Sequence, residues 1–178
     1  TSGELSDLVL ARVRVANILG SIGGWEAIEA LTGALMGPQK DKNWAVRVQC
    51  AYALGAIGGQ SAIEALTRAL VGPHKDESCD TRFAAASALG NIGGESAMEA
   101  LSRALVGGAK HQEACSCLLR NLNLPLCKAF KKDEDVGVRV QVAEVLGAVG
   151  DESATEALSR ALLKDRSSRV RVAAAVAL

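Results

Sequence analysis

Four features are scarce or missing in the 178 residues of this protein. Aromatic residues make up only 3% of the chain, and 20 basic side chains balance 20 acidic ones, so no charge of one sign is in excess. A protein that wraps nucleic acid or lies on an anionic membrane normally carries a broad positive field. The even balance predicts that neither nucleic acid nor a membrane is a partner.

Long hydrophobic runs and paired cysteines are also missing. Gly, Arg or Glu interrupts each apolar stretch well before the roughly 20 residues that a membrane span needs, and the amino terminus shows no basic stretch followed by an apolar one. The five cysteines are an odd number without CxxC spacing. These absences predict a cytoplasmic protein with free thiols.

What is present is a repeated segment. The sequence reads LGSIGG at 19–24, LGAIGG at 54–59, LGNIGG at 89–94 and LGAVGD at 146–151. The first glycine of this pattern steps by 35 residues twice and then by 57, which leaves room for one shortened copy. The chain is therefore a repeat array forming one domain, 1–178. We place its copies at about 11–45, 46–80, 81–108, 109–131 (degenerate), 132–165 and 166–178 (partial).

Within one copy, apolar residues recur at the spacing of a helix. One stripe is Val46, Cys50, Ala53, Leu54 and Ile57, and a second is Ile63, Leu66, Ala69 and Leu70. Gly58 and Gly59 are predicted to end the first helix, and Gly72 with Pro73 the second. Neither helix buries its stripe alone, so copies must stack. The sequence predicts an all-α, right-handed α-solenoid of stacked antiparallel helix pairs, whose alanine-rich stripes suit close helix approach.

A glutamate recurs in step in three copies. Each follows a serine by three positions, which is the spacing of a capping box worth about 1 kcal/mol. Each also precedes an arginine by four positions, the favourable order for a helical ion pair. These sets are Ser61, Glu64 and Arg68; Ser96, Glu99 and Arg103; and Ser153, Glu156 and Arg160. Two local mechanisms explain the glutamate, so a role in folding is favoured over a site that acts on a ligand.

The same residues lie on the side of the second helix that is predicted to be exposed, together with Ala65 and Ala100. Stacking would align them into acidic and basic rows, and we predict a partner protein on this ridge, with Trp25 as an apolar anchor. A plain solvated face is the alternative. Trp25 and Trp44 stand where other copies have smaller residues, which suits a binding hot spot or the buried cap of an end copy. The predicted binding residues are Glu64, Arg68, Glu99, Arg103, Glu156, Arg160 and Trp25.

A second repeated pattern, which we call the arginine ladder, places an aspartate six residues before an arginine. Arg47 falls at the edge of the core-facing apolar side of its helix, so its guanidinium would be partly buried and needs a carboxylate. We expect the loop aspartate to supply it as an inter-helix or inter-repeat staple. A phosphate site is disfavoured, because a phosphate-binding arginine would not carry its own carboxylate. The pairs are Asp41 and Arg47, Asp76 and Arg82, Asp133 and Arg139, and Asp165 and Arg171.

The chain resembles the HEAT-like repeats of the phycobilisome-lyase type in two segments, VRVQCAYALGAIGGQSAIEALTRAL and VRVQVAEVLGAVGDESATEALSRALLKD. The resemblance covers most of the chain from about residue 11; the match is poor at 109–131, and GPQK and GPHK lengthen two loops. Such repeats occur in bilin-attaching lyases, di-iron deoxyhypusine hydroxylases and scaffolds. The hydroxylases bind iron through His-Glu pairs, and neither His74 nor His111 precedes a glutamate. The resemblance implies a non-catalytic protein-interaction scaffold or, alternatively, a subunit of a bilin lyase or a related chaperone-like partner.

The degenerate copy holds the sharpest candidates for chemistry, His111, Cys115, Cys117 and Cys127. The first two are four residues apart and suit a shared metal. However, Cys115 and Cys117 would point about 200° apart on an ideal helix. Cysteine as a small core residue, as predicted for Cys50, is the simpler interpretation. We predict no catalytic residue, no metal and no cofactor, and expect this short copy, whose second helix would begin at Pro125, to change the curvature.

The segment SSRVRVAAAVAL at the carboxyl end begins a helix and stops before the glycine of its copy. This predicts a fragment, or an edge that another molecule completes. Solenoid ends need a polar cap, so exposed apolar residues there predict end-to-end self-association. The residues expected to be exposed are Val170, Val172, Ala174 and Val176.

Overall fold

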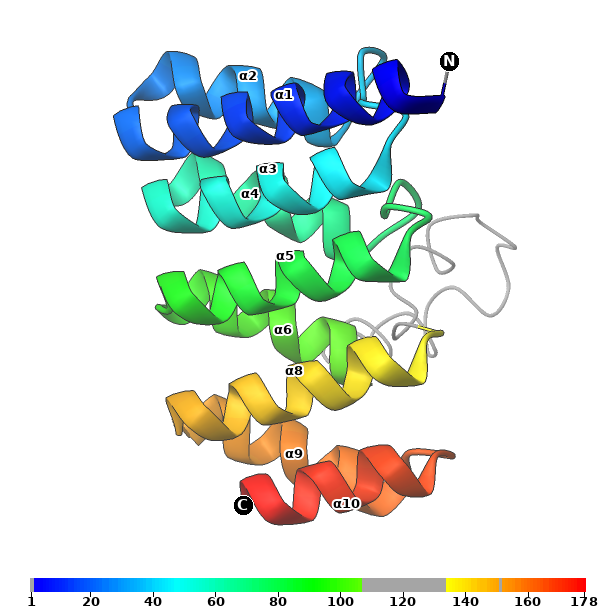
Figure 1. Ribbon diagram of the computed structural model, residues 1–178. Coiled ribbons are helices and arrows are strands. Elements are labelled where there is room, and N and C mark those ends of the chain that lie inside the picture. The colour runs from blue at the N-terminus through cyan, green and yellow to red at the C-terminus, as the bar shows by residue number, and fades with distance from the viewer. Residues whose placement is uncertain (1, 107–133, 151) are drawn as a thin grey trace, which may run out of the picture.

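The protein is a stack of helix pairs in the computed structural model, which describes residues 2–106, 134–150 and 152–178. These residues form nine helices and no strand, and the two termini lie at opposite ends of the stack (Figure 1). The first row consists of α1 (Ser2–Ile22), α3 (Trp44–Ile57), α5 (Cys79–Ile92), α8 (Val136–Val149) and α10 (Ser168–Ala177). The second row consists of α2 (Trp25–Leu35), α4 (Gln60–Leu70), α6 (Glu95–Val106) and α9 (Glu152–Lys164). The all-α array of stacked helix pairs predicted from the sequence is confirmed.

Glycine pairs turn the chain from the first row to the second. Gly58 ends α3 with φ 72°, and Gly59 leads into α4 with φ 82°. Both angles lie in the region that side-chain-bearing residues rarely adopt. The predicted ends of α3 and α4 are therefore confirmed, since α4 stops at Leu70, just before Gly72 and Pro73.

The predicted capping box of Ser61 and Glu64 is wrong. α4 begins at Gln60 with Gly59 as its N-cap and has no side-chain cap, so Ser61 already lies inside the helix. α6 likewise begins one residue before Ser96, at Glu95. The serine cannot cap a helix that has started before it. Side-chain caps occur in the first row instead, where Asn43 Oδ1 accepts a hydrogen bond from Ala45 N at 2.9 Å.

The second-row helices bury a wider face than their sequence pattern predicts. Ala65 and Ala100, expected on the surface, are buried, while Ile63 is only half-buried. The reason is that α4 packs on α5 of the following copy as well as on α3. A helix held between two neighbours needs a second buried side, and the small alanines provide it.

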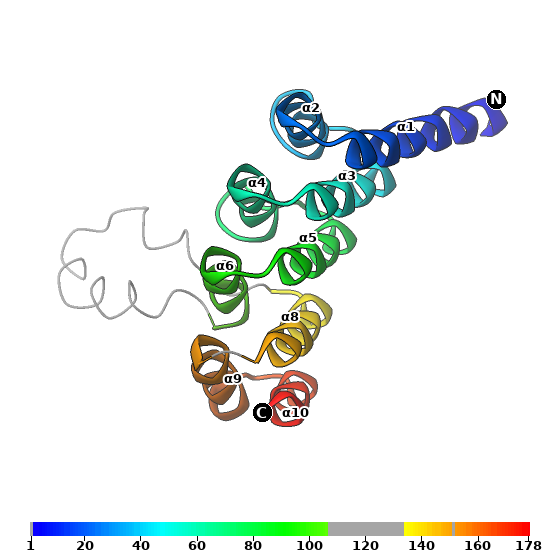
Figure 2. The same cartoon turned by 90° about the vertical axis from the view of Figure 1, so that its left-hand side faces the viewer.

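The first-row helices approach one another closely through small residues. A Cβ atom added to Gly20 would lie 2.9 Å from Ala53 Cβ, one on Gly55 would lie 2.7 Å from Ala88 Cβ, and one on Gly147 would lie 2.5 Å from Ala177 Cβ. The second-row helices contact one another less. The stack therefore curves with the first row on its inner side, as Figure 2 shows.

The predicted degenerate copy at 109–131 lies outside the described residues. On either side of it, α5 and α8 pack directly against each other. The first row is therefore continuous from α1 to α10.

Candidate functional site

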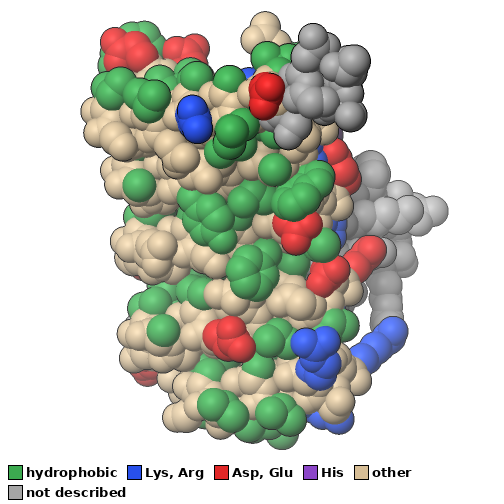
Figure 3. All heavy atoms as spheres, viewed as in Figure 1, with side chains coloured by type: hydrophobic (Ala, Val, Ile, Leu, Met, Phe, Trp, Pro, Cys, Tyr) green, Lys and Arg blue, Asp and Glu red, His purple; other side chains and the backbone are tan. Residues whose placement is uncertain are grey.

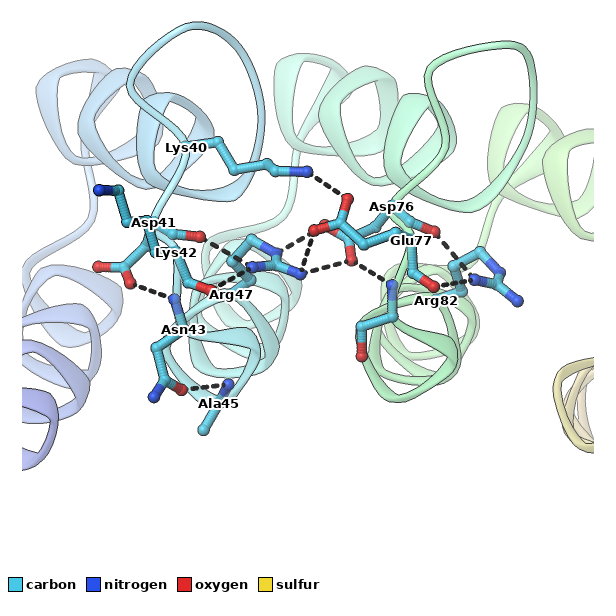
Figure 4. Close-up of polar contacts among 10 residues, drawn as sticks. Lys40, Asp41, Lys42, Asn43, Ala45, Arg47, Asp76, Glu77 and Arg82 are labelled. Atoms are coloured by element: carbon cyan, nitrogen blue, oxygen red, sulfur yellow. Dashed lines mark hydrogen bonds and ion pairs between the residues drawn. The ribbon is translucent and has the colours of Figure 1, made fainter. Parts of the chain in front are cut away.

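The guanidinium of Arg47 is held entirely by the protein. Its side chain is 2% exposed, and it donates from Nε to Asp76 Oδ2 at 2.7 Å and from Nη2 to Asp76 Oδ1 at 3.0 Å (Figure 4). Nη1 donates to the backbone carbonyls of Asp41 and Lys42, and Nη2 also donates to Glu77. All five N–H groups are occupied, so none is left for a phosphate.

Three arginines, Arg12, Arg47 and Arg139, each pair with an aspartate of the following described copy. Arg12 Nε lies 3.1 Å from Asp41 Oδ2, and Arg139 Nε lies 3.0 Å from Asp165 Oδ2. The predicted inter-repeat staple is confirmed for these pairs and for Arg47. The aspartate six residues before an arginine plays a different part from the one predicted: Asp41 offers Arg47 its backbone carbonyl, while its carboxylate reaches back to the preceding copy.

The positive charge of the buried Arg47 is compensated by the carboxylates around it. Burial lowers the pKa of Arg47, but the hydrogen bonds and negative charge of Asp76, followed by the charges of Glu77 and Asp41, outweigh it and raise that pKa above its ordinary value. A hydrogen bond from Lys40 holds the pKa of Glu77 below its ordinary value. The ladder is thus a charge-compensated part of the repeat interface.

The predicted ridge on the second row is partly brought together. Glu64, Arg68, Glu99 and Arg103 line one groove of about 480 Å³ between α4 and α6. The ion pair between Glu99 and Arg103 is 2.5 Å long, and that between Glu156 and Arg160, on α9, is 4.0 Å. Glu64 instead accepts a hydrogen bond from Gln60 and makes no ion pair with Arg68, both of which the structure describes.

The two tryptophans are exposed and lie in different rows. Trp25 begins α2 and is 69% exposed, while Trp44 begins α3 and is 51% exposed. Neither is the buried cap of an end copy. Trp25 is therefore exposed, and its role as an apolar anchor stays a prediction. Trp44 belongs to the first row.

Sequence reasoning missed the inner face of the first row as a surface. Of the fourteen large hydrophobic residues that are exposed in the described chain, only Trp25 and Leu163 lie outside the first row and its end. The exposed charges on α3, α5 and α8 are Asp80 and Glu144 alone, because the arginines of these helices are buried. Figure 3 shows hydrophobic side chains gathered over this face with scattered charges among them.

One hydrophobic residue in each first-row helix directly follows an arginine of the ladder. We call these arginines the ladder arginines: Arg12, Arg47, Arg82, Arg139 and Arg171. The hydrophobic residues that follow them, which we call the apolar stripe, are Val13, Val48, Phe83, Val140 and Val172. Phe83 is 39% exposed, Val172 is 62% exposed and the others are half-buried. A groove of about 680 Å³ between α8 and α10 is lined by Val140 and Val172. Helices that are apolar on every side, as in WAVRVQCAYALGAI, are the sequence signal that would have indicated this face.

The predicted exposure of the carboxyl-terminal helix is half right. Val172 and Val176 are exposed, at 62% and 83%, but Val170 and Ala174 are fully buried. α10 packs against both α8 and α9, which explains why part of its surface is buried. End-to-end association stays a prediction.

The two cysteines that the structure describes differ in reactivity. Cys50 is buried, as predicted for a small core residue, and burial together with the charge of Asp41 raises the pKa of its thiol to about 12. Cys79 is exposed at the start of α5. His111, Cys115, Cys117 and Cys127 lie outside the described residues; within 2–106, 134–150 and 152–178 no group of side chains is arranged to hold a metal ion.

This difference predicts the outcome of thiol labelling. In a variant with Cys115, Cys117 and Cys127 changed to serine, a chromogenic disulfide reagent at pH 8 should label Cys79 promptly and Cys50 only after unfolding in urea. The thiolate is the reactive form, and the Cys50 thiol stays protonated far above pH 8. Equal labelling rates of both thiols in the folded protein would contradict the buried position of Cys50.

None of the helices in the described part of the chain combines the length and apolar character needed to cross a membrane.

Comparison with known proteins agrees with this architecture. A family model for HEAT repeats matches residues 7–78, 39–112 and 123–178. No curated protein matches significantly.

Among solved structures, the complex of CpcE and CpcF of phycocyanin lyase from Nostoc sp. PCC7120 is similar with a TM-score of 0.57 and 25% identity. The match covers 97% of this chain and 58% of that chain, so the present chain spans little more than half of its length. Human deoxyhypusine hydroxylase in complex with glycerol matches with a TM-score of 0.31 and 24% identity, over 95% of this chain and 78% of that one. The resemblance predicted from the repeated segments is confirmed, and the chain belongs to the HEAT repeat family.

Proposed function

We propose that the chain is a protein-binding subunit of a lyase of the phycocyanin-lyase kind, and that it docks a partner protein on the inner face of its first row. The observation that carries the proposal is the match of 97% of this chain to a chain of the CpcE and CpcF complex, in which the two proteins are bound to each other. The alternative function is a scaffold outside any lyase, and it would use the same face.

The chemistry of the inner face supports a docking role. Trp44 and Tyr52 on α3 and Phe83 on α5 are 51%, 40% and 39% exposed. Aromatic residues of this kind often carry most of the energy of an interface, and covering apolar surface contributes about 25 cal/mol per Å². Because charges are sparse here, a partner would desolvate few of them.

The ridge on the second row is the second candidate surface. Its groove of about 480 Å³ and its ion pairs suit recognition by polar contacts. Exposed ion pairs contribute at most about 1 kcal/mol each, so they would select a partner more than hold it. We therefore place the main docking energy on the inner face.

Co-expression with each lyase protein tests the proposal and separates the two faces. A tagged form of the chain should retain CpcE or CpcF of Nostoc sp. PCC7120. Changing Tyr52→Glu together with Phe83→Glu should weaken retention at least about tenfold, because two apolar anchors become charged. Changing Arg68, Arg103 and Arg160 together to glutamate should alter affinity less than about threefold.

Thermal unfolding followed by circular dichroism would verify that both variants stay folded. Retention of neither lyase protein by the unmodified chain would contradict the lyase assignment. Loss of the partner in the arginine variant alone would move the docking site to the ridge.

A further inference from the structure

Resting on the proposed function, we propose that the apolar stripe seats a single amphipathic α-helix of the partner. This helix is about 16–20 residues long, lies along the axis of the stack across α3, α5, α8 and α10, and carries basic side chains beside its apolar face.

The stripe is continuous because the arginine ladder sets its register. Each stripe residue is the direct neighbour of a ladder arginine, as Val48 is of Arg47 and Val140 of Arg139. The arginines are locked to the following copy, with Arg47 bound to Asp76 and Arg139 to Asp165. These bonds fix the level of the stripe residues on α3 and α8, and the repeat places those of the other first-row helices at the corresponding position.

The repeat distance of the stripe suits a helix. Packed helices lie about 8–10 Å apart, and seven residues of an α-helix rise about 10.5 Å. The partner therefore advances about 5–7 residues, at most one heptad, for each first-row helix that it passes. Crossing from α3 to α10 covers three such intervals, about 24–30 Å, which corresponds to about 16–20 residues.

The width of the apolar surface also favours an α-helix as the occupant. On α3, apolar exposure runs from Trp44 to Tyr52, which is eight residues or about 12 Å along the helix. An α-helix with its side chains is about 10–12 Å across. An extended polyproline segment, whose turn of about 9.3 Å also keeps step with the stack, is thinner and would leave Trp44 and Tyr52 largely uncovered.

Charge and shape define the flanks of the occupant. Asp80 and Glu144 are exposed on this face and call for lysine or arginine on the partner. Near α10 the groove of about 680 Å³ is lined by Val140 and Val172, and by Glu144 and Arg169, which carry opposite charges. It can receive a large apolar side chain, and a basic neighbour of that side chain would lie on the Glu144 side, away from Arg169.

Synthetic peptides of 18 residues test this directly by fluorescence anisotropy. The probe carries leucine at the two apolar positions of each heptad, lysine beside them, and alanine and glutamine elsewhere. A scrambled peptide of the same composition has no continuous apolar face. A third peptide has proline at its centre and cannot form a continuous helix.

We expect the helical probe to bind the folded chain at least tenfold more tightly than either control peptide. Phe83→Glu should weaken it at least tenfold, and Asp80→Lys with Glu144→Lys severalfold. The variant with Arg68, Arg103 and Arg160 changed to glutamate should bind it as the unmodified chain does.

Equal binding of the proline peptide would overturn the helical occupant in favour of an extended one, and binding insensitive to Phe83→Glu would place the peptide elsewhere. If the probe fails to bind while Tyr52→Glu with Phe83→Glu still abolishes retention of CpcE or CpcF, the helix proposal is wrong and the docking face stands. If that double variant retains the lyase protein, the docking face itself is rejected, and the helix proposal with it.

Discussion

Arg47→Ala is expected to lower the free energy of unfolding by about 3–5 kcal/mol, as measured by urea unfolding. The substitution removes one member of an ion pair in which both side chains are only 2% exposed. The carboxylate of Asp76 would stay buried without its partner, which is the costly way to break such a pair. The carbonyls of Asp41 and Lys42 would also lose their donor.

Two controls make this result specific. Arg68→Ala removes an exposed arginine that makes no ion pair with Glu64, so stability should change by less than about 0.5 kcal/mol. Changing Arg47→Met together with Asp76→Leu should recover part of the loss, because the buried charge is removed with its partner. Unchanged stability of Arg47→Ala combined with loss of partner binding would identify Arg47 as a ligand residue and reverse our assignment.

Gly55→Val is expected to cost about 3 kcal/mol or more, and Gly55→Ala about 1–3 kcal/mol. The added Cβ would lie 2.7 Å from Ala88 Cβ and 3.0 Å from Ala88 Cα. Because one of these atoms belongs to the backbone of α5, the two helices must move apart. This overpacking outweighs the gain of up to about 1 kcal/mol that alanine brings to a helix interior.

Gly33→Ala in α2 is the matched control for this prediction. Its Cβ would meet no atom within 4 Å, so only the gain in helix propensity should remain, about 0.5–1 kcal/mol in favour of the variant. Thermal and urea unfolding of both variants decide the matter. If Gly55→Ala stabilises the protein as Gly33→Ala does, then α3 and α5 are not in the close contact described.

The sequence alone was sufficient to predict the helix pairs and their ends. Apolar spacing is a local property that survives stacking, so Cys50, Leu54 and Leu66 are buried where the pattern places them. Glycine pairs such as Gly58 and Gly59 are equally local, since only a residue without Cβ enters their backbone region easily. The same locality explains one error: the serine and glutamate spacing of a capping box is also met one residue inside a helix, as Ser61 shows.

The partner of each buried arginine was decided by stacking. The spacing of Asp41 and Arg47 correctly predicts that an aspartate pairs with a buried arginine. In the stack, however, the Asp41 carboxylate lies against Arg12, and the aspartate that pairs with Arg47 is Asp76. A fixed interval in the chain cannot distinguish a carboxylate of the same copy from that of the next, because both recur with the same period.

The inner face likewise exists only in the folded stack. The sequence alone determines that the helices form pairs and where each helix ends. It also determines that arginines and aspartates alternate along the array. These features follow from local conformation and repetition. Which side of the array becomes concave depends on distances between helices. Trp44 and Tyr52 belong to one helix, α3, but Phe83 belongs to α5. Gly55 against Ala88 brings these two helices into close contact, so the joining of their exposed aromatic residues into one surface is a consequence of tertiary packing that no single copy encodes.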